Sequence, residues 1–307
     1  MVSSWDGSIQ LHDMTSLESP SKPSIYSTPA AVLSATFGSS PSTAFSGGLD
    51  RRLREWDFTT GQNRVIGKHD DAIQTVTWCP EQNIVITGSW DSTLRVWDPR
   101  SSTQISVSTL PSKVYAASFA PTSSSLLISM AHRNVHVYDV RKMQEPTQKR
   151  ESALKFMTRS VACMADGKGW ASGSIEGRIA VEYFDSDPAV QSQKYAFRCH
   201  RQAVDGVDCV YPINALAYHP IHNTFASGGS DGFISIWDHT AKKRMKQYPK
   251  FSNEISALSF SPDGSKLAIG ISYEHDNGVP NAEDREKRQL LVKTTVMDDC
   301  KPKVKAA

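Results

Sequence analysis

No stretch of the chain is apolar for long enough to span a bilayer, although 39% of its 307 residues are hydrophobic. The beginning, Met1-Val2-Ser3-Ser4, also lacks the basic and apolar regions of a signal peptide. An excess of one charge is missing as well, because 34 basic residues nearly balance 32 acidic ones and leave a net charge of +2. Charge alone therefore indicates no partner. We expect an intracellular protein with a large core and without a membrane partner.

Cysteine is too scattered for a disulfide framework or a zinc site. The five cysteines are odd in number and show no Cys-x-x-Cys spacing, so free thiols are expected. A phosphate-binding Gly-x-x-x-x-Gly-Lys-Ser/Thr motif and a His-Glu-x-x-His pair are also missing. The sequence therefore predicts neither a cofactor nor a metal.

One catalytic motif occurs formally, because Gly228 to Gly232 match the Gly-x-Ser-x-Gly nucleophile elbow. An elbow needs a strand-to-helix turn, whereas this stretch lies between two expected strands. His69 and Asp91 could form a dyad, but a buried structural network with Trp97 is the interpretation we favour. We predict that the protein is not an enzyme. A propeller enzyme stays open as an alternative, and it would require a nucleophile or metal that the sequence does not reveal.

What the chain does contain is a repeat. Six stretches of alternating residues end in an aspartate, at intervals of 44, 41, 41, 46 and 53 residues, and three of these endings read Trp-Asp. A period of about 40 to 45 residues with Trp-Asp endings and four short strands per unit is typical of a WD-repeat propeller blade. We therefore predict an all-β, seven-bladed WD-repeat β-propeller over residues 1–297, with a disordered tail over 298–307.

Each repeat has an inner strand, a turn, a second strand, an acidic hairpin and a third strand. Blade one lacks its leading strands in this sequence, because its hairpin begins almost at Met1. We expect this incomplete first blade to lower stability relative to a version extended at its amino terminus. The inner strands of the other blades are expected at 31–37, 72–78, 113–119, 157–164, 212–218 and 254–260.

Two tryptophans stand in the hairpin between the second and third strands. Trp5 and Trp90 share this position, where other blades carry Leu49, Ala131, Ile175 and Ser230. Tryptophan supplies a large contact area and is enriched at binding hot spots, so both residues are candidate anchors for a partner. The alternative is that each packs on its own neighbouring blade.

Basic residues accompany the hairpin and links of blade five. The candidates are Arg150, Arg159, Arg178, Lys194, Tyr195, Arg198 and Arg201, with Tyr195 part of the basic-aromatic run. Because arginine binds carboxylate and phosphate with two parallel hydrogen bonds, an acidic or phosphorylated peptide would suit this face. A solvated face without function is the alternative. The run 242–246 is interpreted as protection of an outer strand edge, and 273–288 as a solvated insertion.

Several stretches resemble one family of WD-repeat proteins more closely than the repeat requires. They include 88–100, 150–155, Ser174-Ile175-Glu176-Gly177-Arg178, the run Phe197-Arg198-Cys199-His200-Arg201 and 222–232. From about Val2 to the tail, the chain resembles the spindle-assembly-checkpoint WD-repeat proteins of the BUB family (Bub-three). The related messenger-RNA export WD-repeat factors are the rival, and Asp98-Pro99-Arg100 and Glu182-Tyr183 resemble the checkpoint family better.

The resemblance implies a non-enzymatic adaptor. Its members would bind GLEBS motifs in the checkpoint kinase and its kinase-like relative, and would read phosphorylated Met-Glu-Leu-Thr repeats on the kinetochore scaffold. If the contact residues of the family are transferred to the matching positions of this sequence, Trp5 and Trp90 would pack against the GLEBS peptide. Arg159, Arg178, Lys194, Arg198 and Arg201 would pair with its acidic residues or with the phosphate. The resemblance further implies a monomeric propeller in hetero-complexes, without direct nucleic-acid binding, in the nucleus, at mitotic kinetochores and in the cytoplasm. Ubiquitin binding is also expected.

Overall fold

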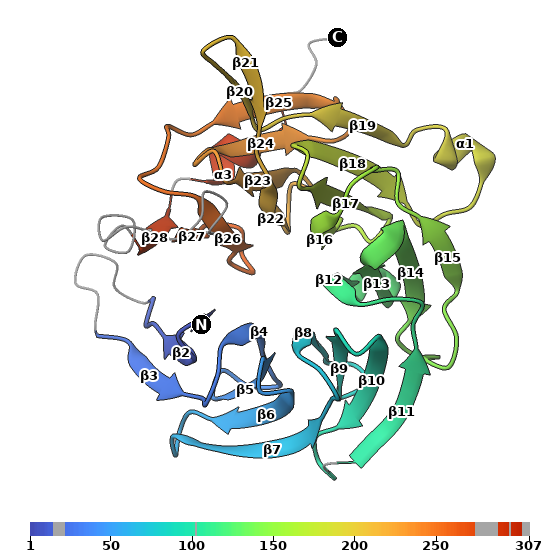
Figure 1. Cartoon of the computed structure of the whole chain (residues 1–307), viewed down its shortest axis with the longest axis vertical. Coiled ribbons are helices and arrows are strands. Elements are labelled where there is room, and N and C mark those ends of the chain that lie inside the picture. The colour runs from blue at the N-terminus through green and yellow to red at the C-terminus, as the bar shows by residue number, and fades with distance from the viewer. Residues whose placement is uncertain (15–21, 102, 274–287, 295, 303–307) are drawn as a thin grey trace. The chain divides into compact units, whose positions relative to one another are not determined.

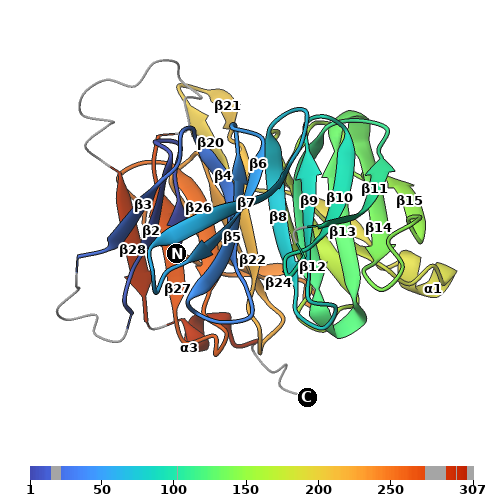
Figure 2. The same ribbon diagram turned by 90° about the horizontal axis from the view of Figure 1, so that it is seen from below.

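The computed structural model describes residues 1–14, 22–101, 103–273, 288–294 and 296–302. These residues form two compact units, one of residues 1–117 with 126–150, and the other of residues 118–125 with 151–307. Antiparallel sheets make up nearly all of the regular structure (Figures 1 and 2). No helix among the described residues is both long enough and apolar enough to cross a membrane.

The first unit contains the sheets of blades one to three. Blade one has three strands in the order β1 (Val2–Ser3), β2 (Ser8–Leu11) and β3 (Ser24–Ser27). Blade two has β4 (Val32–Phe37), β5 (Thr43–Gly48), β6 (Arg52–Asp57) and β7 (Gln62–Lys68). Blade three has β8 (Ile73–Cys79), β9 (Ile84–Ser89), β10 (Thr93–Asp98) and β11 (Thr103–Thr109). Each blade is a meander of sequential strands, so the chain order is also the spatial order.

The residues of blade four are divided between the two units. It has β12 (Val114–Ala120), β13 (Ser125–Met130), β14 (Asn134–Asp139) and β15 (Gln148–Glu151). Short 3-10 turns at Pro121–Ser123 and Ala131–Arg133 lie in its connections.

The second unit contains blades five to seven and one additional hairpin. Blade five has β16 (Thr158–Cys163), β17 (Gly169–Ser174), β18 (Arg178–Tyr183) and β19 (Tyr195–Arg198), with helix α1 (Pro188–Gln191) between the last two. Blade six has β22 (Ile213–Tyr218), β23 (Phe225–Gly229), β24 (Ile234–Asp238) and β25 (Lys243–Gln247). Blade seven has β26 (Ile255–Phe260), β27 (Leu267–Ile271) and β28 (Gln289–Lys293), and helix α3 (Met297–Cys300) follows.

In four blades, glycine near the end of the second strand lets the next blade pack closely. A Cβ atom on Gly47 of β5 would lie 2.5 Å from the Ile73 side chain of β8, and one on Gly228 of β23 would lie 2.3 Å from Ile255 of β26. Cβ atoms cannot approach other atoms that closely, so the missing side chain makes room for a β-branched residue of the neighbouring inner strand. Ile73 and Ile255 are fully buried there. This repeated contact joins successive blades within each unit.

The strand pattern predicted from the repeat is confirmed, including the seven-bladed β-propeller class. Each of the six predicted inner strands is present, with boundaries within one residue of the observed ones. Blade one has three strands, in keeping with the incomplete blade that was predicted. The sequence did not predict the two-stranded sheet of β20 (Arg201–Val204) and β21 (Val207–Val210). This hairpin projects from the second unit between blades five and six (Figures 1 and 2).

The carboxyl end of the chain is ordered further than predicted. Residues 298–300, expected to begin a disordered tail, belong to α3, and the Cys300 side chain is fully buried. Residues 303–307 lie outside the described residues, as do residues 274–287 of the expected insertion between β27 and β28. The basic run lies on the outer strand β25, as predicted. Whether residues 1–297 form one domain stays a prediction.

Candidate functional site

The hairpins between second and third strands share one backbone contact. In each of six blades, a hairpin N–H donates to the carbonyl of the residue just before the inner strand, over 2.9 to 3.1 Å. The donors in the first unit are Leu49, Trp90 and Ala131, and those in the second unit are Ile175, Ser230 and Ser272. The hairpin position is therefore the same for Trp90, Leu49, Ala131, Ile175 and Ser230. We call this end of a blade its hairpin end.

In blade five the hairpin end gathers arginines. Arg178 at the start of β18 and Arg198 at the end of β19 are direct cross-strand partners. Side chains of such partners lie on one face of the sheet, with Cβ atoms about 5 Å apart. Arg198 is exposed and Arg178 is half-buried, with its Nε atom 3.6 Å from the Glu176 carboxylate. The Arg178 and Arg198 side chains therefore start from neighbouring positions on one face of this blade.

Two further arginines extend this set. Arg201 donates from Nη2 to the Glu176 carbonyl oxygen over 3.0 Å and from Nη1 to the Asp208 carboxylate over 3.1 Å. Arg159 is the second residue of β16, where the register with β17 shifts, and is half-buried. We call Arg159, Arg178, Arg198 and Arg201 the arginine cluster. Arg178 lies near the Glu176 carboxylate, and Arg201 pairs with the Asp208 carboxylate.

Lys194 and Tyr195 are not brought together with this cluster. Tyr195 is the partner of Val181 at the opposite end of β19, three residues from Arg198, which corresponds to about 10 Å along a strand. Its hydroxyl donates to the His239 carbonyl oxygen over 3.0 Å, and Lys242 Nζ lies 4.7 Å from its ring centroid. Burial raises the pKa of this hydroxyl. The Tyr195 side chain therefore connects blades five and six, and the exposed Lys194 precedes it.

The two candidate tryptophans differ in exposure. Trp5, in the hairpin between β1 and β2, is 70% exposed, the largest value among the large apolar residues of the described chain. The backbone turn that follows Trp5 is stabilised by the Asp6 carboxylate, which accepts a hydrogen bond from the Ser8 N–H over 2.8 Å. Trp90 is half-buried in the hairpin between β9 and β10. The alternative that Trp5 is a packing residue does not agree with its exposure.

Comparison with known proteins adds independent information. The family model "WD domain, G-beta repeat" matches residues 61–98 and 192–238. "Mitotic checkpoint protein BUB3.1" of Arabidopsis thaliana is 42% identical over 310 residues, which cover 99% of this chain and 88% of the relative. "Spindle assembly checkpoint protein bub3" of Schizosaccharomyces pombe is 37% identical over 272 residues, 89% of this chain and 83% of the relative. The chain belongs to the Bub3 family.

The export WD-repeat proteins are close relatives of this Bub3-family chain. "Poly(A)+ RNA export protein" of Schizosaccharomyces pombe is 34% identical over 307 residues, which cover 99% of this chain and 86% of the relative. The lower identity agrees with the order of resemblance that the sequence motifs gave.

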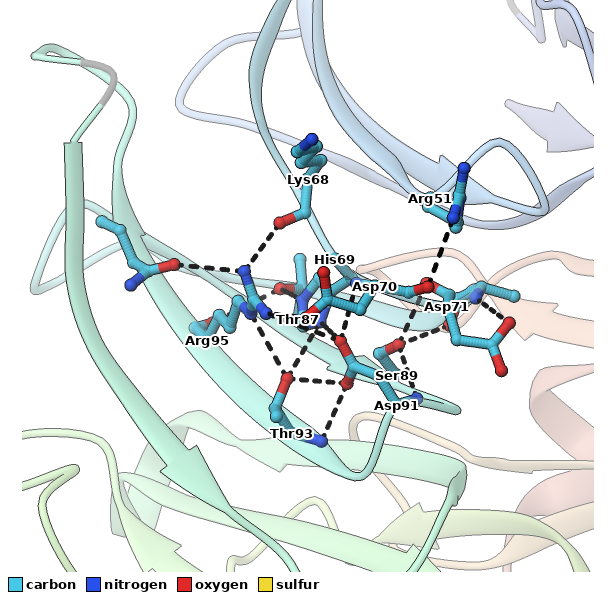
Figure 3. Close-up of polar contacts among 12 residues, drawn as sticks. Arg51, Lys68, His69, Asp70, Asp71, Thr87, Ser89, Asp91, Thr93 and Arg95 are labelled. Atoms are coloured by element: carbon cyan, nitrogen blue, oxygen red, sulfur yellow. Dashed lines mark hydrogen bonds and ion pairs between the residues drawn. The ribbon is translucent and has the colours of Figure 1, made fainter.

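The two possible catalytic arrangements are structural in this Bub3-family chain. Residues 228–232 join strand β23 to strand β24, so the helix that a nucleophile elbow requires is not there. His69 Nδ1 lies 2.9 Å from Asp91 Oδ2, and His69 Nε2 lies 2.7 Å from Thr87 Oγ1 (Figure 3). Trp97 Nε1 donates to the same Thr87 oxygen over 2.8 Å. This is the predicted network of His69, Asp91 and Trp97, with Thr87 as a link that the sequence analysis missed.

Burial favours the neutral form of the His69 ring in this network. His69 is 1% exposed, and this burial lowers the pKa of its imidazole, while the Asp91 charge acts in the opposite direction. A neutral ring can donate from Nδ1 to Asp91 and accept at Nε2 from Thr87. Blade six repeats the arrangement, with His200 between Asp231 at 2.9 Å and Ser227 at 2.8 Å, and Trp237 donating to Ser227. Among the described residues, no group of three or more His, Cys, Asp or Glu side chains is placed to hold a metal ion.

The sequence analysis also missed apolar residues beside the arginine cluster. Phe156 and Met157 are 54% and 41% exposed, and the Met157 carbonyl accepts the Ile175 N–H at the hairpin end of blade five. Both were assigned to the approach and start of an inner strand, so their exposure could not be anticipated. In the sequence, these residues appear only as a Phe-Met pair directly before a strand. Such a pair is equally typical of buried residues, so it did not indicate exposure.

Proposed function

We propose that the chain is a non-enzymatic adaptor of the spindle-assembly checkpoint. In this role it binds GLEBS motifs of the checkpoint kinase and its kinase-like relative, and brings them to phosphorylated Met-Glu-Leu-Thr repeats at kinetochores. Membership of the Bub3 family supports the checkpoint role, because relatives over most of the chain carry mitotic-checkpoint names. The protein would act in the nucleus and at the mitotic kinetochore.

The observation that carries the proposal is the paired placement of Arg178 and Arg198 on one face of blade five. Two neighbouring guanidinium groups can hold a phosphate or a carboxylate through several charge-assisted hydrogen bonds, which are about twice as strong as neutral ones. A phosphothreonine brings about −1.5 to −2 charges at neutral pH and three acceptor oxygens. The pair therefore has the charge and geometry that an acidic or phosphorylated peptide requires.

Trp5 and Trp90 are assigned to the GLEBS peptide as aromatic contacts. Trp5 lies in the hairpin between β1 and β2 and is 70% exposed, and Trp90 lies in the hairpin between β9 and β10. Exposed tryptophan combines a large apolar surface with little conformational entropy to lose on binding, which is why it often anchors peptides. Variants of the two tryptophans test binding of the GLEBS peptide, separately from variants of the arginine cluster.

Replacement of Arg198 by alanine tests the proposal, because this exposed side chain has the smallest structural role in the cluster. A charge-assisted hydrogen bond contributes about 1.5–3 kcal/mol, so we expect at least about tenfold weaker binding of a phosphothreonine-containing Met-Glu-Leu-Thr peptide in calorimetric titrations. Arg201→Ala is less suitable, since it also removes contacts to Glu176 and Asp208.

Arg100→Ala is the matched control, because Arg100 is an exposed arginine whose guanidinium pairs with Asp98 in blade three. Its affinity for the same peptide should equal that of the wild type. If Arg178→Ala and Arg198→Ala, shown to be folded by circular dichroism, also bound like the wild type, the arginine pair would not be the peptide site.

Messenger-RNA export is the second candidate function. It is favoured by the relatives named as export proteins, which are 34% and 30% identical over nearly the whole chain. In that case the partner would be a nucleoporin GLEBS motif.

A further inference from the structure

The hairpin of blade five departs from a feature that four other hairpins share. An acidic residue follows directly after the hairpin residues Trp5, Leu49, Trp90, Ile175 and Ser230. In four of these hairpins it is an aspartate, whose carboxylate accepts the N–H of the residue two positions later over 2.8 to 3.1 Å. Blade five has Glu176 instead, and its carboxylate accepts no hydrogen bond from the Arg178 N–H among the described residues. The longer side chain therefore does not make the bond that stabilises this turn elsewhere.

The Glu176 carboxylate lies beside an arginine of the cluster. Its Oε2 atom is 3.6 Å from Arg178 Nε, and its Oε1 atom is buried without a hydrogen-bond partner among the described residues. The Glu176 main chain contacts a second arginine, because its carbonyl oxygen accepts from Arg201 Nη2 over 3.0 Å. A buried carboxylate oxygen without a partner destabilises the folded state. Stability alone therefore does not explain why glutamate stands in this hairpin.

Contact through Nε leaves the two terminal nitrogens of Arg178 available. They donate no hydrogen bond among the described residues. Terminal guanidinium nitrogens can bind a carboxylate or a phosphate with two parallel hydrogen bonds. Arg198, the cross-strand partner, is exposed, and its guanidinium has no carboxylate partner in the described part of the chain. The arginine cluster therefore contains one guanidinium restrained by an acid and one that is not.

We propose that Glu176 is a positioning residue, which holds Arg178 through Nε so that the terminal nitrogens face the anionic group of the peptide. Glu176 does not touch the peptide itself and acts through Arg178. The identity of the peptide rests on the proposed function, whereas the restraint on Arg178 does not. A side chain that is ordered before binding loses less conformational entropy when the peptide binds. Glu176 thereby raises the affinity of the cluster.

The test of the restraint is ¹⁵N relaxation of the arginine Nε–H groups in the folded full chain, without a peptide. We expect a higher order parameter for Arg178 than for Arg198. Glu176→Asp should lower the Arg178 value towards that of Arg198, because the shorter carboxylate accepts the turn N–H as in the four other hairpins. The melting temperature should not fall, since the turn gains this bond. An unchanged Arg178 order parameter would overturn the proposal, whether or not the peptide binds.

Two variants then separate the position of the carboxylate from its charge, in calorimetric titrations with the phosphothreonine-containing Met-Glu-Leu-Thr peptide. Glu176→Asp keeps the charge but releases Arg178, so it should weaken binding roughly fivefold, as expected when one more side chain must be ordered. Glu176→Gln keeps the length and an oxygen that can face Nε, so it should bind at least as tightly as the wild type. Equal weakening by both variants would contradict a positioning role.

Glu55→Asp is the matched control. Glu55 Oε2 accepts from Arg64 Nε over 2.7 Å in blade two, so the same substitution releases an arginine outside the cluster. It should lower the Arg64 order parameter and leave the affinity for the peptide unchanged. If the wild type did not bind the peptide, the proposed function would fail, and the relaxation measurement would still decide whether Glu176 restrains Arg178.

Discussion

Single hydroxyl groups connect the strands within a blade. Thr87 of β9 accepts from Trp97 of β10 and contacts His69, and Ser227 of β23 does the same for Trp237 and His200. Blade two keeps only the tryptophan half of this arrangement, with Trp56 donating to Ser46 over 2.8 Å. The sequence reveals the histidine, the aspartate and the tryptophan, because each stands at a fixed place in the repeat. It does not reveal which of many serines and threonines completes the network.

Thr87→Val should therefore be costly, although it nearly preserves volume. The substitution leaves Trp97 Nε1–H and His69 Nε2 buried without their partner, and unsatisfied buried groups cost about 1–3 kcal/mol each. We expect the free energy of unfolding to fall by about 2–4 kcal/mol in urea denaturation. Thr103→Val on the exposed strand β11 is the control and should change it by less than about 0.5 kcal/mol. Equal effects of the two variants would show that the network does not stabilise the blade.

Protonation of His219 provides a test by pH. This fully buried ring accepts the N–H groups of Ile221 and His222 at Nδ1, while Nε2 donates to the Gly264 carbonyl oxygen. Burial lowers its pKa, and the positive charge of a protonated His222 adds to the effect. Since the pKa in the folded state lies below the unfolded value of 6.5, the unfolded state binds the proton more tightly. The stabilisation is therefore complete above pH 6.5 and is lost as the pH falls below it.

We expect the free energy of unfolding to decrease between pH 7.5 and pH 5.5, before the carboxylates titrate. His219→Gln should reduce this decrease, even though it lowers stability at both pH values. A decrease of unchanged size in the variant would mean that other groups, such as the buried His69 and His239 with similarly lowered pKa values, account for it.

At the scale of elements, the inner strands were predictable and the connections were not. Alternation of apolar residues before a turn located β8 and β26 to within one residue. The β20–β21 hairpin was missed because its sequence, Arg201 to Val210, alternates only weakly and reads as a basic link. Its turn is marked by Asp205-Gly206, both with positive φ, which is the sequence signal for a two-residue hairpin. The run 194–201 also reads as a basic link, so Lys194 was grouped with Arg198. In the structure Lys194 precedes strand β19 and Arg198 ends it, so the strand separates the two positions.

Close approach of the backbone within a blade allows a test at this scale. A Cβ atom on Gly48 would lie 2.0 Å from the Ala31 carbonyl oxygen, which accepts the hairpin N–H of Leu49. Backbone cannot yield as a flexible side chain can, so Gly48→Ala should destabilise the fold by about 3 kcal/mol. Gly206→Ala is the comparison, because nothing lies within 4 Å of its Cβ position and only its positive φ opposes the change, at about 1 kcal/mol. Thermal melts that ranked Gly206→Ala as the more destabilising variant would contradict this account.

At the scale of the whole chain, the repeat and the family were readable from sequence, but the arrangement of the arginines was not. The interval between Trp-Asp endings is a property of the chain itself and predicts the propeller class. Pairing of Arg178 with Arg198 depends on the register of β18 and β19, although the two arginines are twenty positions apart in the sequence and a helix is inserted between them.

The central claim is that this Bub3-family chain is an adaptor for checkpoint kinases. The most direct test is a calorimetric titration of the full chain, shown to be folded, with a GLEBS peptide from the checkpoint kinase and with one from the export nucleoporin. Our account predicts tighter binding of the checkpoint peptide. Preference for the nucleoporin peptide, or binding of neither, would contradict it.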